Sequence, residues 1–238
     1  MCTVSFVPTG PQKFILTSNR DETVERGLAS APQRLQLQGI NMICPKDPLA
    51  HGTWIAVAEN DKLTCLLNGA FIKHERHLPY RKSRGIVVLD SLTYASASAF
   101  VSGYDFSNIE PFTMVMISSQ PVTSLHELRW DGVEKHFKRL NENEFHLWSS
   151  VTLYNEEQVK EKERVFRQKL QELKEVNVLS LIDIHKNDFL YEDWVKPPQR
   201  VPEVATLSIT SVSSTEDKPI MHYRDLVRRE LPLTSLKF

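Results

Sequence analysis

The sequence is poor in glycine and cysteine. Only 8 of its 238 residues are glycine, and neither of the glycine-rich phosphate loops, G-x-G-x-x-G and G-x-x-x-x-G-K-[ST], occurs. Cys2, Cys44 and Cys65 are too scattered for a disulfide framework, and no pair has C-x-x-C spacing. The 8 histidines follow no spacing typical of metal ligands. The sequence therefore predicts neither a metal site nor a resident cofactor.

Long apolar runs and an excess of basic residues are also missing. No run reaches the roughly 18 residues of a membrane-spanning helix. The first 25 residues include Asp21, Glu22 and Glu25 and lack the basic-then-apolar order of a signal peptide. The 29 Lys and Arg residues balance 30 Asp and Glu residues, for a net charge of -1, unlike most nucleic-acid binders. We therefore expect a cytoplasmic protein with no integral membrane segment and no nucleic-acid partner.

Short β-prone segments separated by turn residues predict a series of hairpins. The first hairpin is expected around Pro8-Thr9-Gly10-Pro11. The segments expected to be strands are Thr3–Val7, Lys13–Ser18, Trp54–Ala58, Leu63–Leu67, Phe112–Ser118, Leu125–Trp130, Val133–Phe137, Ala205–Val212 and Pro219–Tyr223.

Helices are expected to be fewer. Residues that can cap a helix precede apolar stripes of helical spacing, which predicts helices over about Ser83–Ser102 and Asn155–Glu175. A shorter helix is expected at Leu179–Ile184, and the prolines of Val195–Pro202 predict a loop. The mixture favours a single α+β domain over residues 1–238.

Cys2 is the first candidate for chemistry, because it directly follows the initiator methionine. Removal of Met1 would leave a thiol and a free α-amine on one residue. That amine has a pKa of about 7.7–8.0, so it can act as general base for its own thiol without a histidine. A cysteine at this position can also be a chance occurrence, and retention of Met1 would block the amine.

The run Asn19-Arg20-Asp21-Glu22 follows the apolar residues Phe14–Thr17. If the first two predicted strands pair, Arg20 and Asp21 lie beside the start of the first strand, near Cys2. An arginine beside a thiol favours the thiolate, and an aspartate can orient the α-amine. The alternative interpretation is a polar strand exit that caps a turn.

Five short motifs occur in order along the chain. They are M-C-T at the start, S-N-R-D-E at Ser18–Glu22, G-T-W at Gly52–Trp54, L-N-G at Leu67–Gly69 and S-R-G at Ser83–Gly85. Together they resemble the NRDE family, also called the transport and Golgi organisation protein 2 family. This family is similar to N-terminal-nucleophile hydrolases of the choloylglycine hydrolase and penicillin V acylase type. The resemblance implies a four-layer αββα sandwich, with two antiparallel sheets between helical layers.

The resemblance also implies roles for single residues. Cys2 matches the nucleophile, and Arg20 and Asp21 resemble the arginine and aspartate that flank it, although those two are not adjacent in the hydrolases. Asn68 resembles an asparagine that donates to the tetrahedral oxyanion; from the sequence alone, Asn68-Gly69 is more simply an Asn-Gly turn. The hydrolases use a further asparagine where this chain has Ser149-Ser150, so the hydrolase pattern is incomplete there.

A basic segment before Ser83 is a candidate anion-binding region. Its residues are Lys73, His74, Arg76, His77, Arg81, Lys82 and Arg84, with Glu75 as the one acid. We expect a pocket for an elongated, partly apolar ligand with an anionic end. Trp54 and Phe71 would contact its apolar part, Arg81 or Arg84 its anionic end, and Asn19 would lie beside it. The segment can also be a solvated loop.

Three functions remain open at this stage. The first is an amidohydrolase or thioesterase that uses Cys2. The second is a non-catalytic carrier or chaperone of a lipid-like, acyl-CoA or haem ligand. The resemblance implies this role, because the family is linked to lipid and haem handling. It also implies association with mitochondria or the Golgi. Cys44-Pro45, with His51 nearby, allows a thiolate contact to haem. The third is an adaptor without a ligand.

Overall fold

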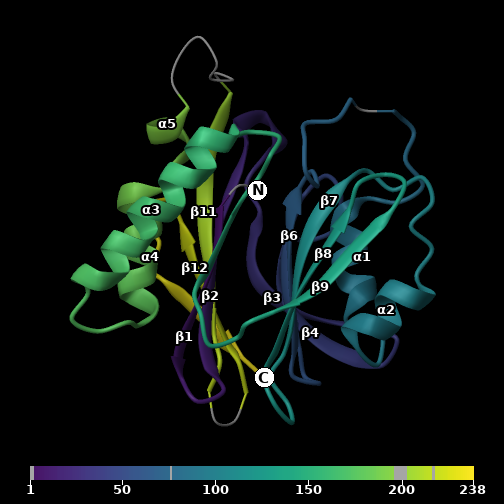
Figure 1. Ribbon diagram of the computed structural model, residues 1–238, viewed down its shortest axis with the longest axis horizontal. Helices are drawn as coiled ribbons and strands as arrows, with labels where there is room; N and C mark the ends of the chain where they lie inside the picture. Colours follow the sequence, from purple (N-terminus) through teal and green to yellow (C-terminus); the bar gives the residue numbers. More distant parts are fainter. Residues whose placement is uncertain (1–2, 76, 196–202, 216–217) are drawn as a thin grey trace.

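The computed structural model describes residues 3–75, 77–195, 203–215 and 218–238. Two antiparallel sheets stand face to face between helical layers (Figure 1). The first sheet has the order β10-β1-β2-β11-β12-β13 in the described chain. Its strands are β1 (Thr3–Gly10), β2 (Lys13–Thr23), β10 (His146–Ser149), β11 (Val204–Ser213), β12 (Ile220–Asp225) and β13 (Thr234–Lys237).

The second sheet is a meander in which each strand pairs with the next one along the chain. Its strands are β3 (Ser30–Leu37), β4 (Ile40–Lys46), β5 (Ile55–Ala58), β6 (Lys62–Asn68), β7 (Phe112–Ser118), β8 (Ser124–Trp130) and β9 (Lys135–Leu140). The tight β3–β4 turn has both of its central residues, Gln38 and Gly39, at positive φ, as a two-residue hairpin requires.

Helices cover the outer face of each sheet (Figure 1). The first sheet carries α3 (Glu156–Glu172), α4 (Val178–Asp188) and α5 (Tyr191–Trp194), and α4 packs on β2 and β11. The second sheet carries α1 (Arg84–Ser91) and α2 (Ala97–Gly103). A 3-10 turn, η1 (Val24–Arg26), follows β2. The architecture is the αββα sandwich that the resemblance implied.

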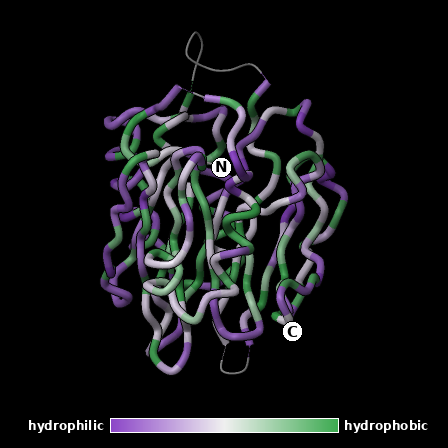
Figure 2. The backbone as a smooth tube through the Cα atoms, turned by 90° about the vertical axis from the view of Figure 1, so that its right-hand side faces the viewer, coloured by the Kyte–Doolittle hydropathy of each residue, from purple (hydrophilic) through white to green (hydrophobic). Residues whose placement is uncertain are grey.

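The two faces of the N-terminal hairpin bury different residues. Val4, Phe6 and Leu16 point into the large core between the sheets. Val7 and Ile15 point the other way, into a smaller core that includes Phe166 of α3. This alternation follows from the period of two along a strand. In Figure 2 hydrophobic residues concentrate in the interior strands, and hydrophilic residues lie mostly toward the periphery.

Most of the predicted strands are confirmed. The predicted hairpins correspond to β1–β2, β5–β6, β8–β9 and β11–β12, and the predicted strand Phe112–Ser118 is β7. The interpretation of Asn19–Glu22 as a polar strand exit is wrong. These residues lie inside β2, where they pair with β11. Strand β2 therefore continues because a partner from the far end of the chain satisfies its backbone.

The single helix predicted over Ser83–Ser102 is also wrong, although Ser83 does cap α1. The chain breaks after α1 and restarts at Ser96, whose side chain accepts from the Ala99 amide at 3.0 Å. The β5–β6 turn holds the break, because Lys62 donates to the carbonyl of Tyr94. Helices α3 and α4 are confirmed, and α3 ends at Glu172. Of the loop predicted at Val195–Pro202, all but Val195 lies outside the described residues.

Candidate functional site

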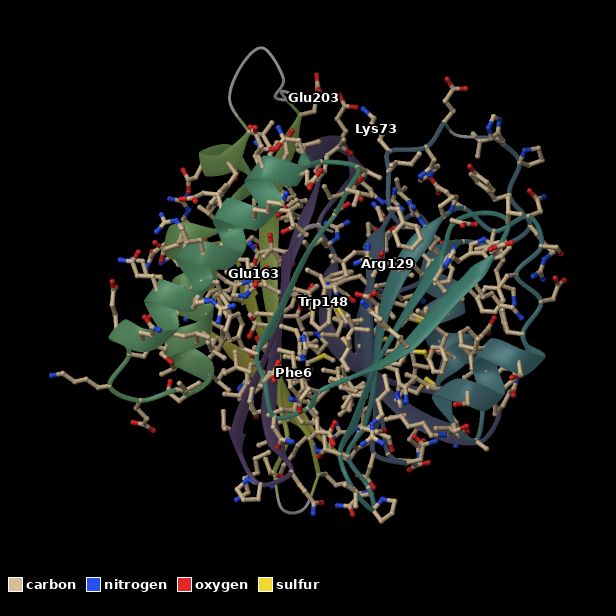
Figure 3. The ribbon with its side chains drawn as sticks, viewed as in Figure 1. Phe6, Lys73, Arg129, Trp148, Glu163 and Glu203 are labelled. Atoms are coloured by element: carbon tan, nitrogen blue, oxygen red, sulfur yellow. The ribbon has the colours of Figure 1, made fainter. Side chains whose placement is uncertain are left out.

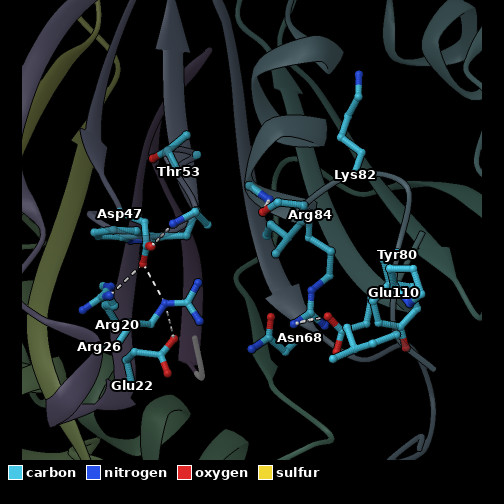
Figure 4. Close-up of a pocket in the computed structure, with 18 residues that line it drawn as sticks. Arg20, Glu22, Arg26, Asp47, Thr53, Asn68, Tyr80, Lys82, Arg84 and Glu110 are labelled. Atoms are coloured by element: carbon cyan, nitrogen blue, oxygen red, sulfur yellow. Dashed lines mark hydrogen bonds and ion pairs between the residues drawn. The ribbon is translucent and has the colours of Figure 1, made fainter. Parts of the chain in front are cut away.

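A cavity of about 460 Å³ lies where β2, the β4–β5 loop, the end of β6 and the start of α1 meet (Figure 4). Four of the residues singled out from the sequence line it: Arg20, Trp54, Asn68 and Arg84. They come from four of the short motifs, which are far apart in the sequence. The fold therefore brings the motifs to one place.

Two glycines let the backbone close one wall of the cavity. The Thr53 amide donates to the Gly85 carbonyl at 3.1 Å. A Cβ atom on Gly52 would lie 2.5 Å from the carbonyl carbon of Gly85, a distance that no side chain tolerates. Only glycine fits this approach, which gives the G-T-W and S-R-G motifs a physical reason.

A buried ion-pair network anchors Arg20 on the floor of the cavity. Both Arg20 and Arg26 donate to Oδ2 of Asp47 at 3.0 Å, and the Ala50 amide donates to Oδ1 at 2.9 Å. Burial alone would raise the pKa of Asp47, but the Ala50 amide and the two guanidinium groups outweigh it and lower the pKa. Asp47 is therefore a carboxylate at neutral pH and fixes the position of Arg20.

Two N–H groups at this cavity have no hydrogen-bond partner among the described residues. They are Nη1 of Arg20 and Nε1 of Trp54, and these side chains are 2% and 4% exposed. The Arg20 guanidinium lies 5.2 Å from the centre of the Trp54 ring, in a cation–π contact. Leaving a buried donor unsatisfied is costly. Both groups are therefore suited to donate to an oxygen atom of a bound molecule.

Asn68 ends β6 at the edge of the cavity. Its backbone carbonyl accepts a hydrogen bond from the Ser150 hydroxyl at 2.8 Å. Gly69 follows with φ 80°, and a Cβ atom there would lie 2.6 Å from a methyl carbon of Val151. No described residue hydrogen-bonds to the Asn68 carboxamide, so its amide group can donate to a ligand.

Arg84 is held at the opposite wall. It forms an ion pair with Glu110 at 3.1 Å and donates to the Pro111 carbonyl at 3.0 Å. Arg20, Arg26, Lys82 and Arg84 face Glu22, Asp47 and Glu110 around the cavity. The lining therefore combines both charge signs, with a small excess of cations.

Asn19 and Asp21 do not line the cavity. They are on the other face of β2, toward the helices. Asn19 donates to the Phe189 carbonyl at 2.8 Å, and its Oδ1 lies 2.8 Å from Nδ1 of His185. Asp21 accepts from Tyr154 at 3.1 Å and from Thr206 at 2.7 Å. Asn19, which was expected beside the ligand pocket, is outside the lining of this cavity, because neighbouring residues of a strand face opposite sides.

His185 is the centre of the hydrogen bonds on that face. Its Nε2 lies 2.8 Å from the Ser5 hydroxyl, and the ring is fully buried. Burial, together with the charge of Lys162, lowers the pKa of His185 to about 3. The ring is therefore neutral, so its Nδ1–H donates to Asn19 and its Nε2 accepts from Ser5. It connects α4 to both strands of the N-terminal hairpin.

Two other candidate residues lie outside the cavity lining. Arg81 donates to the carbonyls of Ser107 and Asp105, so the structure does not bring it to the pocket. Phe71 is 49% exposed and lies under the guanidinium of Arg129. Its predicted contact with the apolar part of a ligand is therefore wrong for this cavity.

Two of the three cysteines lie among the described residues. Cys2 lies outside the described residues. Cys44 and Cys65 are buried and free, and burial raises their pKa values to about 11 and about 12. Cys44 is 1% exposed, so the structure presents no accessible thiol for the haem contact considered at Cys44-Pro45.

Several residues of the site carry no sequence signal. Asp47, Arg26 and Glu110 stand in ordinary loop sequence, and each gains its role from a partner far along the chain. Gly52 and Gly85 were available as a signal, since glycine is scarce and both fall within recognisable motifs. In the described part of the chain, no helix is long and apolar enough to cross a membrane.

Comparison with known proteins adds a family and a fold. The model of the transport and Golgi organisation 2 family matches residues 1–217. No protein of curated function matches the sequence. The conjugated bile acid hydrolase of Clostridium perfringens, in a mutant whose second residue is changed from cysteine to alanine, superposes with a TM-score of 0.66 at 9% identity, over 100% of this chain and 92% of that one.

Two more solved structures share this fold. Penicillin V acylase from Agrobacterium tumefaciens has a TM-score of 0.63 at 9% identity, covering 100% of this chain and 86% of its own. The Caenorhabditis elegans ortholog of N-acylethanolamine-hydrolyzing acid amidase has a TM-score of 0.56 at 13% identity, covering 88% and 92%. At these identities the similarity shows the fold.

Proposed function

Since the chain belongs to the transport and Golgi organisation 2 family and has an N-terminal-nucleophile hydrolase-like fold, we propose that it hydrolyses an amide or thioester bond with Cys2 as the nucleophile. The observation that carries the proposal is the cavity, where the unsatisfied N–H groups of Arg20 and Trp54 lie in one lining with Asn68. The structural neighbours named for amide hydrolysis, and the cysteine that is the second residue of the bile acid hydrolase, support it.

The position of the cavity relative to the N-terminal strand also supports the proposal. Val4 of β1 pairs with Ser18 of β2, and Arg20 is two residues further along β2, at the end where β1 begins. Val4 and Phe6 face the layer between the sheets, which is the layer into which Arg20 points. The described start of β1 is thus directed at the cavity.

The proposed reaction uses two steps. The α-amine of Cys2 removes the thiol proton, and the sulfur attacks the carbonyl carbon while the Asn68 carboxamide donates to the oxyanion. The C–N or C–S bond breaks, and the leaving amine or thiol takes the proton. A water molecule, deprotonated by the α-amine, then cleaves the thioester on Cys2. One water is consumed, and one acid and one amine or thiol are released.

A non-catalytic carrier is the second candidate, and Ser149-Ser150 favours it. Where the hydrolases use a further asparagine, Ser150 donates to the Asn68 carbonyl and lies 2.8 Å from the Thr152 hydroxyl. A lipid-like, acyl-CoA or haem ligand with an anionic group could then bind at Arg20 and Trp54 without being cleaved. Cytoplasmic location, and any association with mitochondria or the Golgi, stay predictions from sequence.

The experiment combines intact mass with turnover. The mass shows whether Met1 is removed. A panel of conjugated bile acids, penicillin V, N-acylethanolamines and acyl-CoA thioesters then tests hydrolysis by wild type, Cys2→Ala and Cys2→Ser. Cys44→Ala is the matched control, because it removes a buried thiol that is not part of the cavity lining.

Each outcome assigns one of the two candidates. Hydrolysis in wild type and Cys44→Ala that is lost at least 1,000-fold in Cys2→Ala supports the hydrolase, in line with removal of a nucleophile. Binding that survives Cys2→Ala, with no cleavage of any member of the panel, supports the carrier. A retained Met1 on the active protein would contradict the hydrolase.

A further inference from the structure

The loop between β6 and α1 presents apolar side chains to solvent. We call residues 70–82 the rim loop. Ile72 is 78% exposed, Leu78 70% and Phe71 49%. Single exposed apolar residues are common on protein surfaces, but here they stand on one short loop at the upper end of the molecule, where Lys73 projects (Figure 3).

Basic residues alternate with these apolar ones. The rim loop sequence contains Lys73, Arg76, Arg81 and Lys82, and Glu75 is its one acidic residue. Lys73 and Arg81 are exposed in the structure. Arg81 pairs with Asp105 and Lys82 with Asp90. The loop therefore offers protruding apolar side chains beside the exposed cations Lys73 and Arg81.

The protrusion is built into the fold, because hydrogen bonds fix both ends of the loop. The Arg81 amide donates to the Asn108 carbonyl at 2.8 Å, and the Asn108 carboxamide donates to the Pro79 carbonyl at 3.1 Å. At the other end, Arg129 donates to the Ala70 carbonyl at 2.8 Å. Ile72 and Leu78 are thus held away from the core by an anchored loop.

The rim loop forms part of the mouth of the cavity. Leu78, Pro79 and Lys82 line the cavity directly. On other segments of the lining, Val24 of η1 is 55% exposed, and Leu49, beside the lining residue Ala50, is 66% exposed. Of the ten large apolar residues that are exposed in the described chain, five lie on segments that line or adjoin the cavity.

We propose that the rim loop docks the protein on the surface of an anionic phospholipid bilayer. Ile72 and Leu78 would enter the boundary between headgroups and acyl chains, and the Lys73 and Arg81 side chains would meet phosphate groups. A bilayer fits this surface better than a folded acidic protein, because Ile72 and Leu78 are 78% and 70% exposed and can enter a lipid surface without a shaped partner. Docking brings the mouth of the cavity to the lipid, so amphiphilic molecules can enter it from the bilayer.

The test is co-flotation with vesicles of phosphatidylcholine alone and of an equimolar mixture of phosphatidylcholine and phosphatidylserine. Wild type is compared with the double variant Ile72→Ser, Leu78→Ser. The matched control is Val133→Ser, Leu179→Ser, whose residues are 83% and 58% exposed and stand on the β8–β9 turn and in α4. Lys73→Glu tests the charge. Equal melting temperatures establish that the variants remain folded.

Docking predicts that wild type and the control float with the phosphatidylserine vesicles. The rim double variant should lose at least ten-fold in partition coefficient, and Lys73→Glu should lose several-fold. Failure of wild type to float, or equal flotation of the rim variant, would overturn the proposal. Binding to polyglutamate without binding to vesicles would replace the bilayer with an acidic protein. Repeating the assay with Cys2→Ala separates docking from the proposed hydrolysis.

Discussion

Neighbouring residues of β2 belong to two different sites. Arg20 points into the cavity and is fixed by Asp47, whereas Asn19 and Asp21 point toward the helices and bind His185, Tyr154 and Thr206. Asn19 and Asp21 therefore attach the helical layer to the sheet. Of these three residues, Arg20 alone lines the cavity.

His185 predicts a loss of stability in mild acid. Its pKa is lowered to about 3 in the folded protein, whereas an unfolded histidine has a pKa of about 6.5. Between these values the unfolded chain binds a proton that the folded chain does not. The contribution of His185 to the free energy of unfolding is therefore fully present above about pH 6.5. It decreases as the pH falls, by about 1.4 kcal/mol at pH 5.5.

Urea unfolding at pH 7.5 and pH 5.5 measures this effect. In His185→Gln the difference between the two pH values should shrink by about that amount. His77→Gln is the matched control, because His77 is exposed. An unchanged pH dependence in His185→Gln would show that the ring does not remain neutral in the folded state.

The sequence could identify Arg20, Trp54 and Asn68 because each stands in a short motif. It could not identify Asp47, Lys162 or His185. Each of these three is an ordinary polar residue of a loop or helix until the fold places it against β1, β2 or η1. The role of a buried polar residue depends on its hydrogen-bond or ion-pair partner, and here that partner is distant in sequence.

At the level of elements, the sequence correctly predicted helix starts that are set by residues adjacent in the chain. Ser83 and Asn155 cap the helices that they were expected to cap. The hairpin β3–β4 was missed because Ser30–Leu37 is largely exposed and contains few apolar residues. The alternation around Gln38-Gly39 was the available signal. The split between α1 and α2 depends on contacts from the β5–β6 turn, and the spacing of apolar residues along a helix cannot predict such contacts.

Gly52→Ala tests the contact between the β4–β5 loop and α1. The added Cβ atom would lie 2.5 Å from the backbone carbonyl carbon of Gly85 and 2.8 Å from the backbone nitrogen of Ile86. The β4–β5 loop and α1 must therefore separate. We expect a loss of about 3 kcal/mol in unfolding free energy, at the upper end of overpacking effects. Denaturant unfolding measures it.

Gly103→Ala is the matched control for this prediction. A Cβ there would lie 3.4 Å from a ring carbon of Tyr94, which is ordinary contact. We expect a change within about 0.5 kcal/mol. Similar losses in both variants would mean that the close approach at Gly52 does not limit stability.

At the scale of the whole molecule, the first sheet joins the two ends of the chain. Strand β2 lies between β1 and β11, and β1 also pairs with β10. The resemblance implied the layers, and alternation predicted the hairpins. Which distant strands pair could not be predicted from local pattern, because burial on both faces makes β2 and β11 similar to many other apolar segments.

Truncation distinguishes the central strand from the edge strand. A chain ending after Arg229 loses β13, a short edge strand with mostly exposed side chains, and should fold with a moderately lower melting temperature. A chain ending after Glu203 loses β11 with Leu207, Ile209 and Val212 of the core. It should fail to fold, because β2 loses its partner along one edge and the core loses these side chains.

Circular dichroism and gel filtration measure both outcomes. The longer truncation should be a compact species with cooperative unfolding, and the shorter one should aggregate or lack a transition. A folded chain without β11 would show that the first sheet does not need its C-terminal half.

The alternation of faces along β2 also limits which mutations can be retained in this strand during evolution. A substitution at one position of the strand disturbs one face. A one-residue insertion or deletion between Lys13 and Asn19 would exchange the faces of everything beyond it. Arg20 would then turn to the helices, while Asn19 or Asp21 would turn to the cavity. Descendants of this sequence should therefore vary in residue identity along β2 far more readily than in its length, and length changes should collect in turns such as Pro11-Gln12, outside the strand.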